Sequence, residues 1–223
     1  MTGPDYGLDD GSGSTGRSGL LGAVDAVDER VDALFEPLRG RPSIDTAAKV
    51  VTAIGDHGWL WTGVALWRGR RSGPNRRAAI RALGVAGVSS TIVNTGIKQV
   101  VGRERPDRTD LRISNAGVPV REPKTSSFPS GHTLAAFTTA VVLPETEAAT
   151  VAAVTFAAAV AASRVHLRAH HPTDVIGGAV MGSLLGLILR PAVRLIAPGS
   201  APRRRRRRGV RGMESGGVWL ERI

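Results

Sequence analysis

The sequence contains no cysteine among its 223 residues. That absence excludes disulfide bonds, zinc sites built from thiolates, and cysteine as a catalytic nucleophile. Aromatic residues make up only 4% of the chain, and lysine occurs just three times, at positions 49, 98 and 124. The candidates for nucleophilic and acid–base chemistry are therefore chiefly the five histidines, at positions 57, 132, 166, 170 and 171.

Acidic residues are outnumbered, because 19 Asp and Glu stand against 30 Lys and Arg and give a formal net charge of +11. Since 42% of the residues are hydrophobic, basic and apolar residues must be separated along the chain. Such basicity favours partners that carry phosphate, whether a nucleic acid, an anionic lipid or a small substrate. The arginine run at 203–208 is compatible with nucleic acid, but attraction to anionic lipid explains it more simply. We therefore predict no nucleic-acid function.

Long apolar segments predict a polytopic membrane protein. Five segments have the composition of transmembrane helices, at about residues 44–67, 78–101, 130–144, 148–162 and 175–196. The third and fourth have roughly 15 residues, against the ~20 that cross a hydrocarbon core, so we predict that their ends open into a recessed, wet pocket. Residues 1–19 have no apolar core, and we predict a disordered tail there.

Residues 20–38 predict an amphipathic helix ahead of the spans. Apolar residues recur there at helical spacing, alongside the acidic residues Asp25, Asp28, Glu29 and Asp32. A spanning helix tolerates few carboxylates, so we expect this helix to lie at the membrane interface or to pack on the bundle. Asp56 and His57 interrupt the first span. We interpret them as an interfacial or helix-packing pair, the alternative being a proton path.

The arginines predict the orientation of the bundle. The loop 68–81 and the tail with Arg203–Arg208 and Arg211 are rich in arginine, and such segments stay cytoplasmic. Alternate threading of the spans then brings the loop 102–129 and the stretch 164–174 together on the extracytoplasmic face. The first of these is itself basic, with Arg103, Arg105, Arg108, Arg112, Arg121 and Lys124.

Three short clusters of chemically active residues lie at the predicted span ends on that face. They are Lys98 with Arg105-Pro106, then Pro129-Ser130-Gly131-His132, then Ser163-Arg164 with His170 and Asp174. Over about residues 44–197 the chain resembles the type-2 phosphatidic acid phosphatase (PAP2) family. The signature motifs of that family read Lys-x6-Arg-Pro, Pro-Ser-Gly-His and Ser-Arg-x5-His-x3-Asp, and all three are complete and in order. The resemblance implies a PAP2/haloperoxidase-like helical core and catalysis without a metal or other cofactor.

The residues themselves suit phosphoryl transfer. Negative charge spreads over the phosphoryl oxygens during transfer, so several fixed cations are needed around them, and Lys98, Arg105 and Arg164 can supply these. Arginine holds two oxygens at once with its planar fork. Ser130 and Gly131 begin a predicted helix, whose free N–H groups favour an anion and where glycine allows a close approach of the backbone.

His170 is the predicted nucleophile. The Asp174 carboxylate would accept the proton on one ring nitrogen and leave the other free to attack phosphorus. His132 would protonate the leaving oxygen and later activate water. The implied intermediate is a phosphohistidine. His171 lies three residues from Asp174 rather than four, and the family spacing selects His170.

Other residues near the motifs are not assigned to the catalytic machinery. His166 and His171 are expected to have structural or supporting roles. His171 stands where family members commonly carry an aromatic residue, which could alter the pocket or its pH profile. Arg103, Glu104 and Arg108 steer substrate or form a solvated rim, with neither favoured.

The sequence thus predicts an all-α, polytopic transmembrane bundle of about five spans plus the amphipathic helix. The predicted parts are a tail over 1–19, a phosphatase domain over 20–200 and a basic cytoplasmic tail over 201–223. The predicted activity is hydrolysis of a lipid phosphate: phosphatidic acid, phosphatidylglycerophosphate, or a polyprenyl mono- or diphosphate. The alternatives are a vanadium-dependent haloperoxidase and a non-catalytic basic protein that binds lipid headgroups. The oligomeric state is left open.

Overall fold

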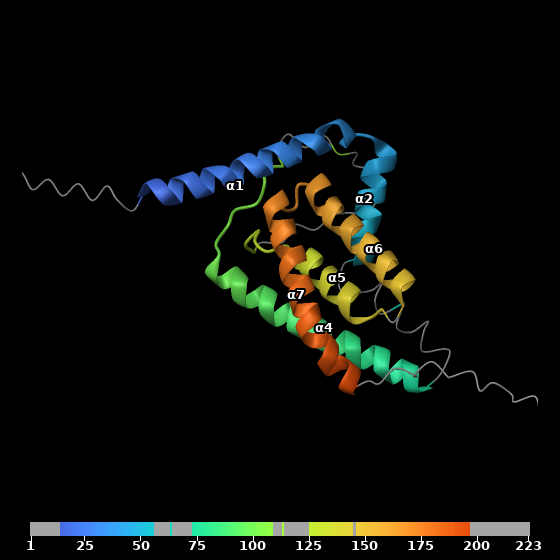
Figure 1. Ribbon diagram of the computed structural model, residues 1–223. Helices are drawn as coiled ribbons and strands as arrows, with labels where there is room; N and C mark the ends of the chain where they lie inside the picture. Colours follow the sequence, from blue (N-terminus) through green and yellow to red (C-terminus); the bar gives the residue numbers. More distant parts are fainter. Residues whose placement is uncertain are drawn as a thin grey trace, which may run out of the picture.

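The computed structural model describes residues 14–55, 63, 73–108, 113, 125–144 and 146–196 (Figure 1). Within these residues the regular structure is helical and no strand occurs. The elements are α1 (Ser14–Phe35), the 3₁₀ helix η1 (Glu36–Leu38), α2 (Pro42–Gly55), α4 (Gly73–Val100), α5 (Gly131–Val142), α6 (Glu147–His166) and α7 (Pro172–Ile196). The all-α class is confirmed for this part of the chain, and the number of spans stays a prediction.

Helix α1 begins earlier than predicted, and several other predictions concern segments outside the described residues. Helix α1 begins at Ser14, so residues 14–19, which we assigned to a disordered tail, are helical. Helix α2 ends at Gly55, and the rest of the first predicted span, with Asp56 and His57, lies outside the described residues. So do the arginines at 68–71 and 203–208, and the predicted orientation stays a prediction.

Helix α6 is longer than predicted. It runs over 20 residues to His166, where the sequence pattern had suggested an end near Ala162. The reason is that the polar residues of its last turns are buried and bonded inside the protein. Ser163 shares a hydrogen bond of 2.7 Å with the hydroxyl of Thr52, and His166 pairs with Asp45. The prediction that the fourth span is short is therefore wrong, whereas α5, with 12 residues, is as short as expected.

The surface of the bundle suits a lipid environment. Helices α6 and α7 are long and apolar enough to cross a membrane, over Glu147–His166 and Pro172–Leu195. Large apolar side chains point outward from α7 and α4, and exposing such groups is costly in water but not in hydrocarbon. They include Ile176, Val180, Leu184, Leu187, Ile188 and Leu195 on α7, and Ile80, Val88 and Ile92 on α4.

Helix α5 is the central element and packs against α4, α6 and α7 (Figure 1). Its contact with α7 is the closest, because three glycines spaced four residues apart on α7 face the α5 backbone. A Cβ at Gly178 would lie 2.8 Å from the Ser130 carbonyl oxygen, and one at Gly186 would lie 3.0 Å from that of Thr138. At Gly182 a Cβ would overlap the carbonyl oxygen of Leu134. Small residues at this spacing let helix backbones meet in membranes.

Replacing Gly182 by alanine should therefore force α5 and α7 apart and lower the stability of the bundle. We expect a loss of about 2 kcal/mol or more, as for other overpacked interiors, seen as a lower midpoint of thermal unfolding in detergent. Gly84→Ala on α4 is the matched control, because a Cβ there meets nothing within 4 Å and alanine favours a helix. Equal unfolding midpoints for the two variants would contradict the close α5–α7 contact.

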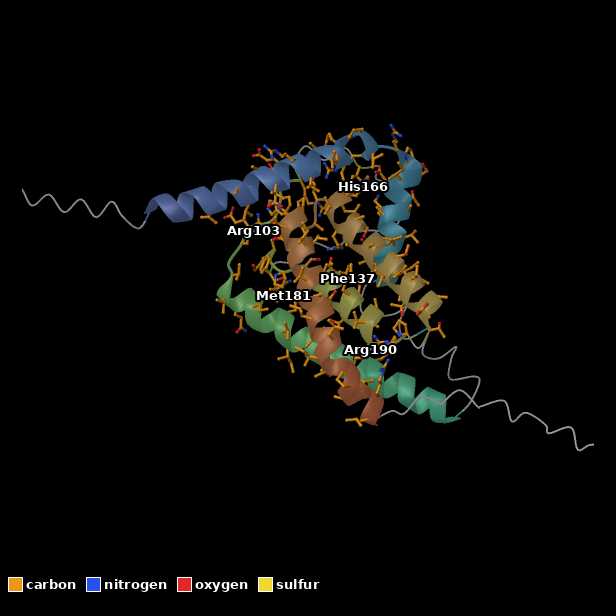
Figure 2. All side chains as sticks on the ribbon, in the orientation of Figure 1. Arg103, Phe137, His166, Met181 and Arg190 are labelled. Atoms are coloured by element: carbon orange, nitrogen blue, oxygen red, sulfur yellow. The ribbon has the colours of Figure 1, made fainter. Side chains whose placement is uncertain are left out.

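Helix α1 crosses the end of the bundle at which α6 ends and α7 begins (Figure 1). Arg103 and His166 lie near this end, and Arg190 lies toward the opposite one (Figure 2). Arg39, in the connection between α1 and α2, pairs with Asp32 of α1. It also donates to the carbonyl oxygens of Val165 and His166 at the end of α6, each at 3.1 Å, and so holds the connection against α6. The amphipathic helix thus packs on the bundle, one of the two placements predicted for it.

Candidate active site

The three predicted clusters meet at the end of the bundle that α1 crosses. Lys98 lies in the last turn of α4 and interacts electrostatically with Arg105, Arg164 and Asp174. The backbone N–H of Ser130, at the start of α5, donates to the carbonyl oxygen of Asp174 at 3.1 Å. Segments far apart in the sequence therefore form one site, as their predicted places at the helix ends required.

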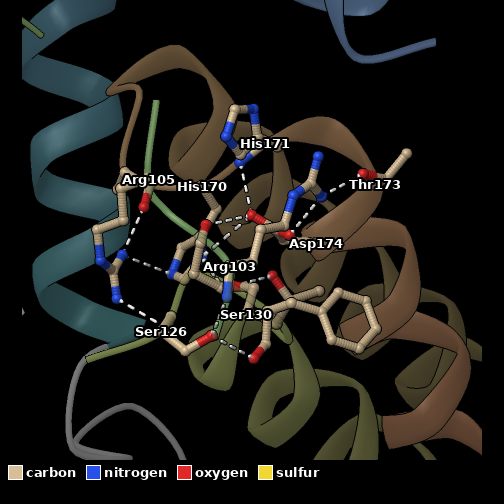
Figure 3. Close-up of polar contacts among 12 residues, drawn as sticks. Arg103, Arg105, Ser126, Ser130, His170, His171, Thr173 and Asp174 are labelled. Atoms are coloured by element: carbon tan, nitrogen blue, oxygen red, sulfur yellow. Dashed lines mark hydrogen bonds and ion pairs between the residues drawn. The ribbon is translucent and has the colours of Figure 1, made fainter. Parts of the chain in front are cut away.

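His170 lies in the turn between α6 and α7, almost fully buried, and its ring is oriented by two partners (Figure 3). Its Nδ1 lies 2.7 Å from the carbonyl oxygen of Ser127. A carbonyl only accepts, so Nδ1 carries the proton. The lone pair is then on Nε2, which lies 3.4 Å from a guanidinium nitrogen of Arg105. The ring thus directs the nitrogen that carries the lone pair toward Arg105.

The surroundings of His170 favour the neutral ring. Burial lowers the pKa of His170 well below its usual value of about 6.5, and the charges of Arg164, Arg105 and Lys98 lower it further. The hydrogen bond to the Ser127 carbonyl acts in the opposite sense but is outweighed. Only the neutral ring has a free lone pair, so these surroundings favour the form of His170 that a nucleophile would need.

The predicted direct bond between Asp174 and His170 is wrong. The carboxylate lies 3.9 Å from Nδ1, beyond hydrogen-bond reach. Asp174 has other partners, since Oδ1 accepts from Arg103 at 2.8 Å, while Oδ2 accepts from the Ser127 hydroxyl and from the His171 backbone N–H. Its hydrogen-bonded link to the His170 ring runs through Ser127, whose carbonyl fixes the tautomer.

Arg105 is held in place by backbone oxygens. Its Nη1 donates to the carbonyl of Ala169 at 2.6 Å, and Nε donates to that of Thr125 at 3.2 Å. Lys98 Nζ donates to the Thr125 hydroxyl at 3.3 Å. Arg164 is only 2% exposed and acts electrostatically on both His170 and Lys98. The charges of all three cations act on the His170 ring, and a group of fixed cations suits a phosphoryl group.

The start of α5 forms the remaining side of the site. Ser130 is fully buried at the N-cap position of α5, and its side chain makes no capping bond to the helix. His132 is half-buried in the first turn. Gly131 has a close neighbour that the sequence did not reveal, because a Cβ would approach the Asn94 side chain of α4 to 3.0 Å. The glycine thus helps α4 pack close to the start of α5.

His166 and His171 were predicted to have structural or supporting roles. His166 is buried, with Nε2 2.8 Å from Asp45 Oδ1 and its ring edge-on to Phe35, which is a structural role. The backbone N–H of His171 helps hold Asp174, and the function of its half-buried ring stays a prediction. Among the described residues, no group of three His, Asp or Glu side chains is placed to hold a metal ion.

Sequence reasoning missed two residues of the site, Ser127 and Arg103. Ser127 precedes the Pro-Ser-Gly-His motif by one residue, and only the fold shows that its carbonyl meets His170. Arg103 was interpreted as steering substrate or as part of a solvated rim, yet its guanidinium bonds Asp174, Thr173 and Asp28. Its position two residues before Arg105 was the one signal available.

Comparison with known proteins gives consistent matches. The profile of the PAP2 superfamily matches residues 79–196. The decaprenylphosphoryl-5-phosphoribose phosphatase of Mycolicibacterium smegmatis is 35% identical over 146 residues, covering 66% of this chain and 77% of that protein. The lipid A 1-phosphatase of Rhizobium johnstonii is 30% identical, covering 63% of this chain and 64% of that one. A transmembrane PAP2 type phosphatidylglycerolphosphate phosphatase from Bacillus subtilis superposes with a TM-score of 0.61 at 26% identity, covering 78% of this chain and 88% of that one.

Proposed function

The chain belongs to the PAP2 superfamily, and on that premise we propose that it is a membrane phosphatase that hydrolyses a lipid phosphate through a phosphohistidine at His170. The observation that carries this proposal is the buried ring of His170, whose Nδ1 is bonded to the Ser127 carbonyl and whose Nε2 lies beside Arg105. Burial and the nearby cations lower the pKa of His170 and favour its neutral form. A nucleophile and fixed cations in this arrangement match what phosphoryl transfer requires.

The proposed reaction has two steps. In the first, His170 Nε2 attacks phosphorus and the bond from phosphorus to the lipid oxygen breaks, while His132 gives its proton to that oxygen. In the second, His132 takes a proton from water, the resulting hydroxide attacks phosphorus, and the bond to Nε2 breaks to release inorganic phosphate. Lys98, Arg105, Arg164 and the backbone N–H at Gly131 stabilise the charge on the phosphoryl oxygens. Ser130 was predicted to help bind the phosphate through its N–H, but that group is bonded to the Asp174 carbonyl, so Ser130 contributes by positioning the start of α5. Asp174 acts as a positioning residue through Ser127.

The first substrates to test are polyprenyl-linked phosphates. The relative from M. smegmatis is named for a substrate in which a phosphorylated pentose is linked to decaprenyl phosphate. Phosphatidylglycerophosphate and phosphatidic acid follow, the former because of the name of the B. subtilis protein. We propose that residues 20–200 form the catalytic unit in the plasma membrane, with the site on the extracytoplasmic face and an arginine-rich cytoplasmic tail over 201–223.

The test is phosphate release by the purified protein in detergent, with and without EDTA. We expect turnover of at least one of these lipids that EDTA does not abolish, and a strict need for a divalent metal would refute the mechanism. Halide oxidation after addition of vanadate, without phosphatase activity, would favour the haloperoxidase alternative. Tight binding of the lipids without phosphate release would favour the non-catalytic alternative.

The neutral state of His170 gives a separate prediction. Since burial and three cations lower the pKa of His170, its ring should remain neutral as the pH falls through 6.5, where an ordinary histidine gains a proton. Nitrogen-15 NMR of histidine-labelled protein measures this directly, with the His170→Asn spectrum assigning the signals. Half-protonation of His170 at or above pH 6.5 would contradict the prediction.

A further inference from the structure

Asp28, in the middle of α1, is buried against the candidate active site, whereas its neighbours Asp25 and Glu29 on the same helix are exposed. Its side chain is 7% exposed. One carboxylate oxygen accepts the backbone N–H of Thr173 at 2.7 Å. The other accepts the Thr173 hydroxyl at 2.8 Å and Arg103 Nη2 at 2.5 Å. A buried carboxylate with three donors is a specific contact, because removing such a charge from water is costly unless it is fully bonded.

The residue that Asp28 holds, Arg103, joins all three motif segments. Its backbone carbonyl accepts the N–H of Ser127 at 2.8 Å, and its own N–H donates to the Ser126 hydroxyl at 3.2 Å. Its guanidinium donates to the Thr173 hydroxyl at 2.7 Å and to Asp174 Oδ1 at 2.8 Å (Figure 3). Arg103 thus connects the Lys98–Arg105 segment to the loop before α5 and to the start of α7.

Asp28 also caps α7 from outside that helix. Thr173 is the second residue of α7, after Pro172, and the N–H groups of a first helical turn have no partner within the helix. A carboxylate at that end bonds such an N–H and favours the positive end of the helix dipole. The capped turn carries Asp174, and His170 lies in the connection just before it. Asp28 therefore fixes the element that positions the nucleophile.

We propose that Asp28 is a positioning residue for catalysis: it clamps Arg103 and the first turn of α7, so that Asp174 and Ser127 hold the His170 ring in its attacking orientation. This inference rests on the proposed function. Asp28 lies outside residues 79–196, the part that matches the superfamily profile. A tether for α1 without catalytic consequence is the alternative.

The single-turnover rate separates these possibilities. With the enzyme saturating and in excess over a lipid phosphate, this rate reports only correctly folded molecules, so partial unfolding of a variant does not lower it. We expect Asp28→Asn to reduce it about tenfold to a hundredfold, since displacements of about 1 Å have effects of this size. KM should change by less than about threefold, because the phosphate-binding cations have other anchors. Asp28→Glu, which keeps the carboxylate, should recover most of the rate.

The matched control is Asp25→Asn, an exposed acid one turn earlier on α1, and it should keep the wild-type rate. A single-turnover rate for Asp28→Asn within twofold of wild type would overturn the proposal, whatever its thermal stability. If Asp28→Asn does not fold, Thr173→Val decides, because it removes only the hydroxyl shared by Asp28 and Arg103. That variant should lose about three- to tenfold, and a wild-type rate would overturn the proposal.

Orthovanadate provides a readout independent of turnover. Its five-coordinate form resembles phosphoryl transfer, and such analogues bind best to a correctly arranged site. We expect vanadate to raise the unfolding temperature of the wild type, and the concentration needed to rise at least tenfold in Asp28→Asn, with the effect of inorganic phosphate unchanged. If the wild type releases no phosphate from any lipid, the proposed function fails. The vanadate titration still tests whether Asp28 positions Arg103 and the first turn of α7. Equal vanadate responses in the two proteins, or none in the wild type, would overturn it.

Discussion

Replacing His170 by alanine should abolish catalysis, lowering kcat/KM for a lipid phosphate by about 10⁴-fold or more. Loss of a nucleophile has effects of this size because no other group forms the covalent intermediate. The fold should persist. The Ser127 carbonyl loses its donor, which costs about 1–3 kcal/mol for a buried acceptor, so the unfolding midpoint should fall by only a few degrees. Phosphate release and thermal unfolding in the same detergent measure both effects.

The matched control is His171→Ala, which removes the neighbouring ring but keeps the backbone N–H that donates to Asp174. We expect it to retain activity within about tenfold of wild type. Brief reaction with phosphate-labelled lipid, quenched with base, should leave label on the wild type and none on the His170→Ala variant. Loss of activity in His171→Ala with retention in His170→Ala would show that the register of the third motif had been assigned wrongly.

The convergence of the site could be predicted from the sequence because its residues lie at helix ends. Alternate threading of the predicted spans placed Lys98, Ser130 and His170 on one face, and the structure brings their segments together. The residue types then indicated the chemistry, since fixed cations beside an imidazole suit phosphoryl transfer. Neither step required knowledge of side-chain contacts.

The partners within the site could not be predicted in the same way. A spacing of four residues between His170 and Asp174 suggested a direct bond, but the two residues flank the start of α7 and are not one turn apart on a continuous helix. The Asp174 carboxylate bonds Arg103 and Ser127 instead. Backbone carbonyls, such as that of Ser127, carry no signature in sequence, so the group that orients His170 was undetectable.

Polar residues also led to a wrong prediction for the end of α6 and hid the buried place of Asp28 on α1. The fourth span was expected to end near Ala162, before the polar residues Ser163 and Arg164, yet α6 continues to His166. Ser163 and His166 have partners on α2, the Thr52 hydroxyl and the Asp45 carboxylate. The acidic residues of α1 were set against its apolar face, whereas Asp28 is buried on Arg103 and Thr173. In both cases a polar side chain is buried because a hydrogen-bonding partner from a distant segment meets it.

Replacing Arg164 by lysine should be nearly as damaging as removing the charge altogether. Arg164 is 2% exposed in the last turn of α6, and its charge acts on His170 and Lys98. A lysine ammonium keeps the charge but cannot hold two phosphoryl oxygens with one planar fork. Enclosed, preoriented donors of this kind contribute factors of about 10²–10³ to the rate.

We therefore expect Arg164→Lys to lower kcat/KM by about 100-fold, which corresponds to about 2.7 kcal/mol of transition-state stabilisation. The affinity for orthovanadate should fall by a similar factor. Arg194→Lys, an exposed arginine in the last turn of α7, is the control and should behave as wild type. If Arg164→Lys kept kcat/KM within threefold of wild type, Arg164 would supply charge alone, and bidentate binding of the phosphoryl group would have to be assigned to Arg105.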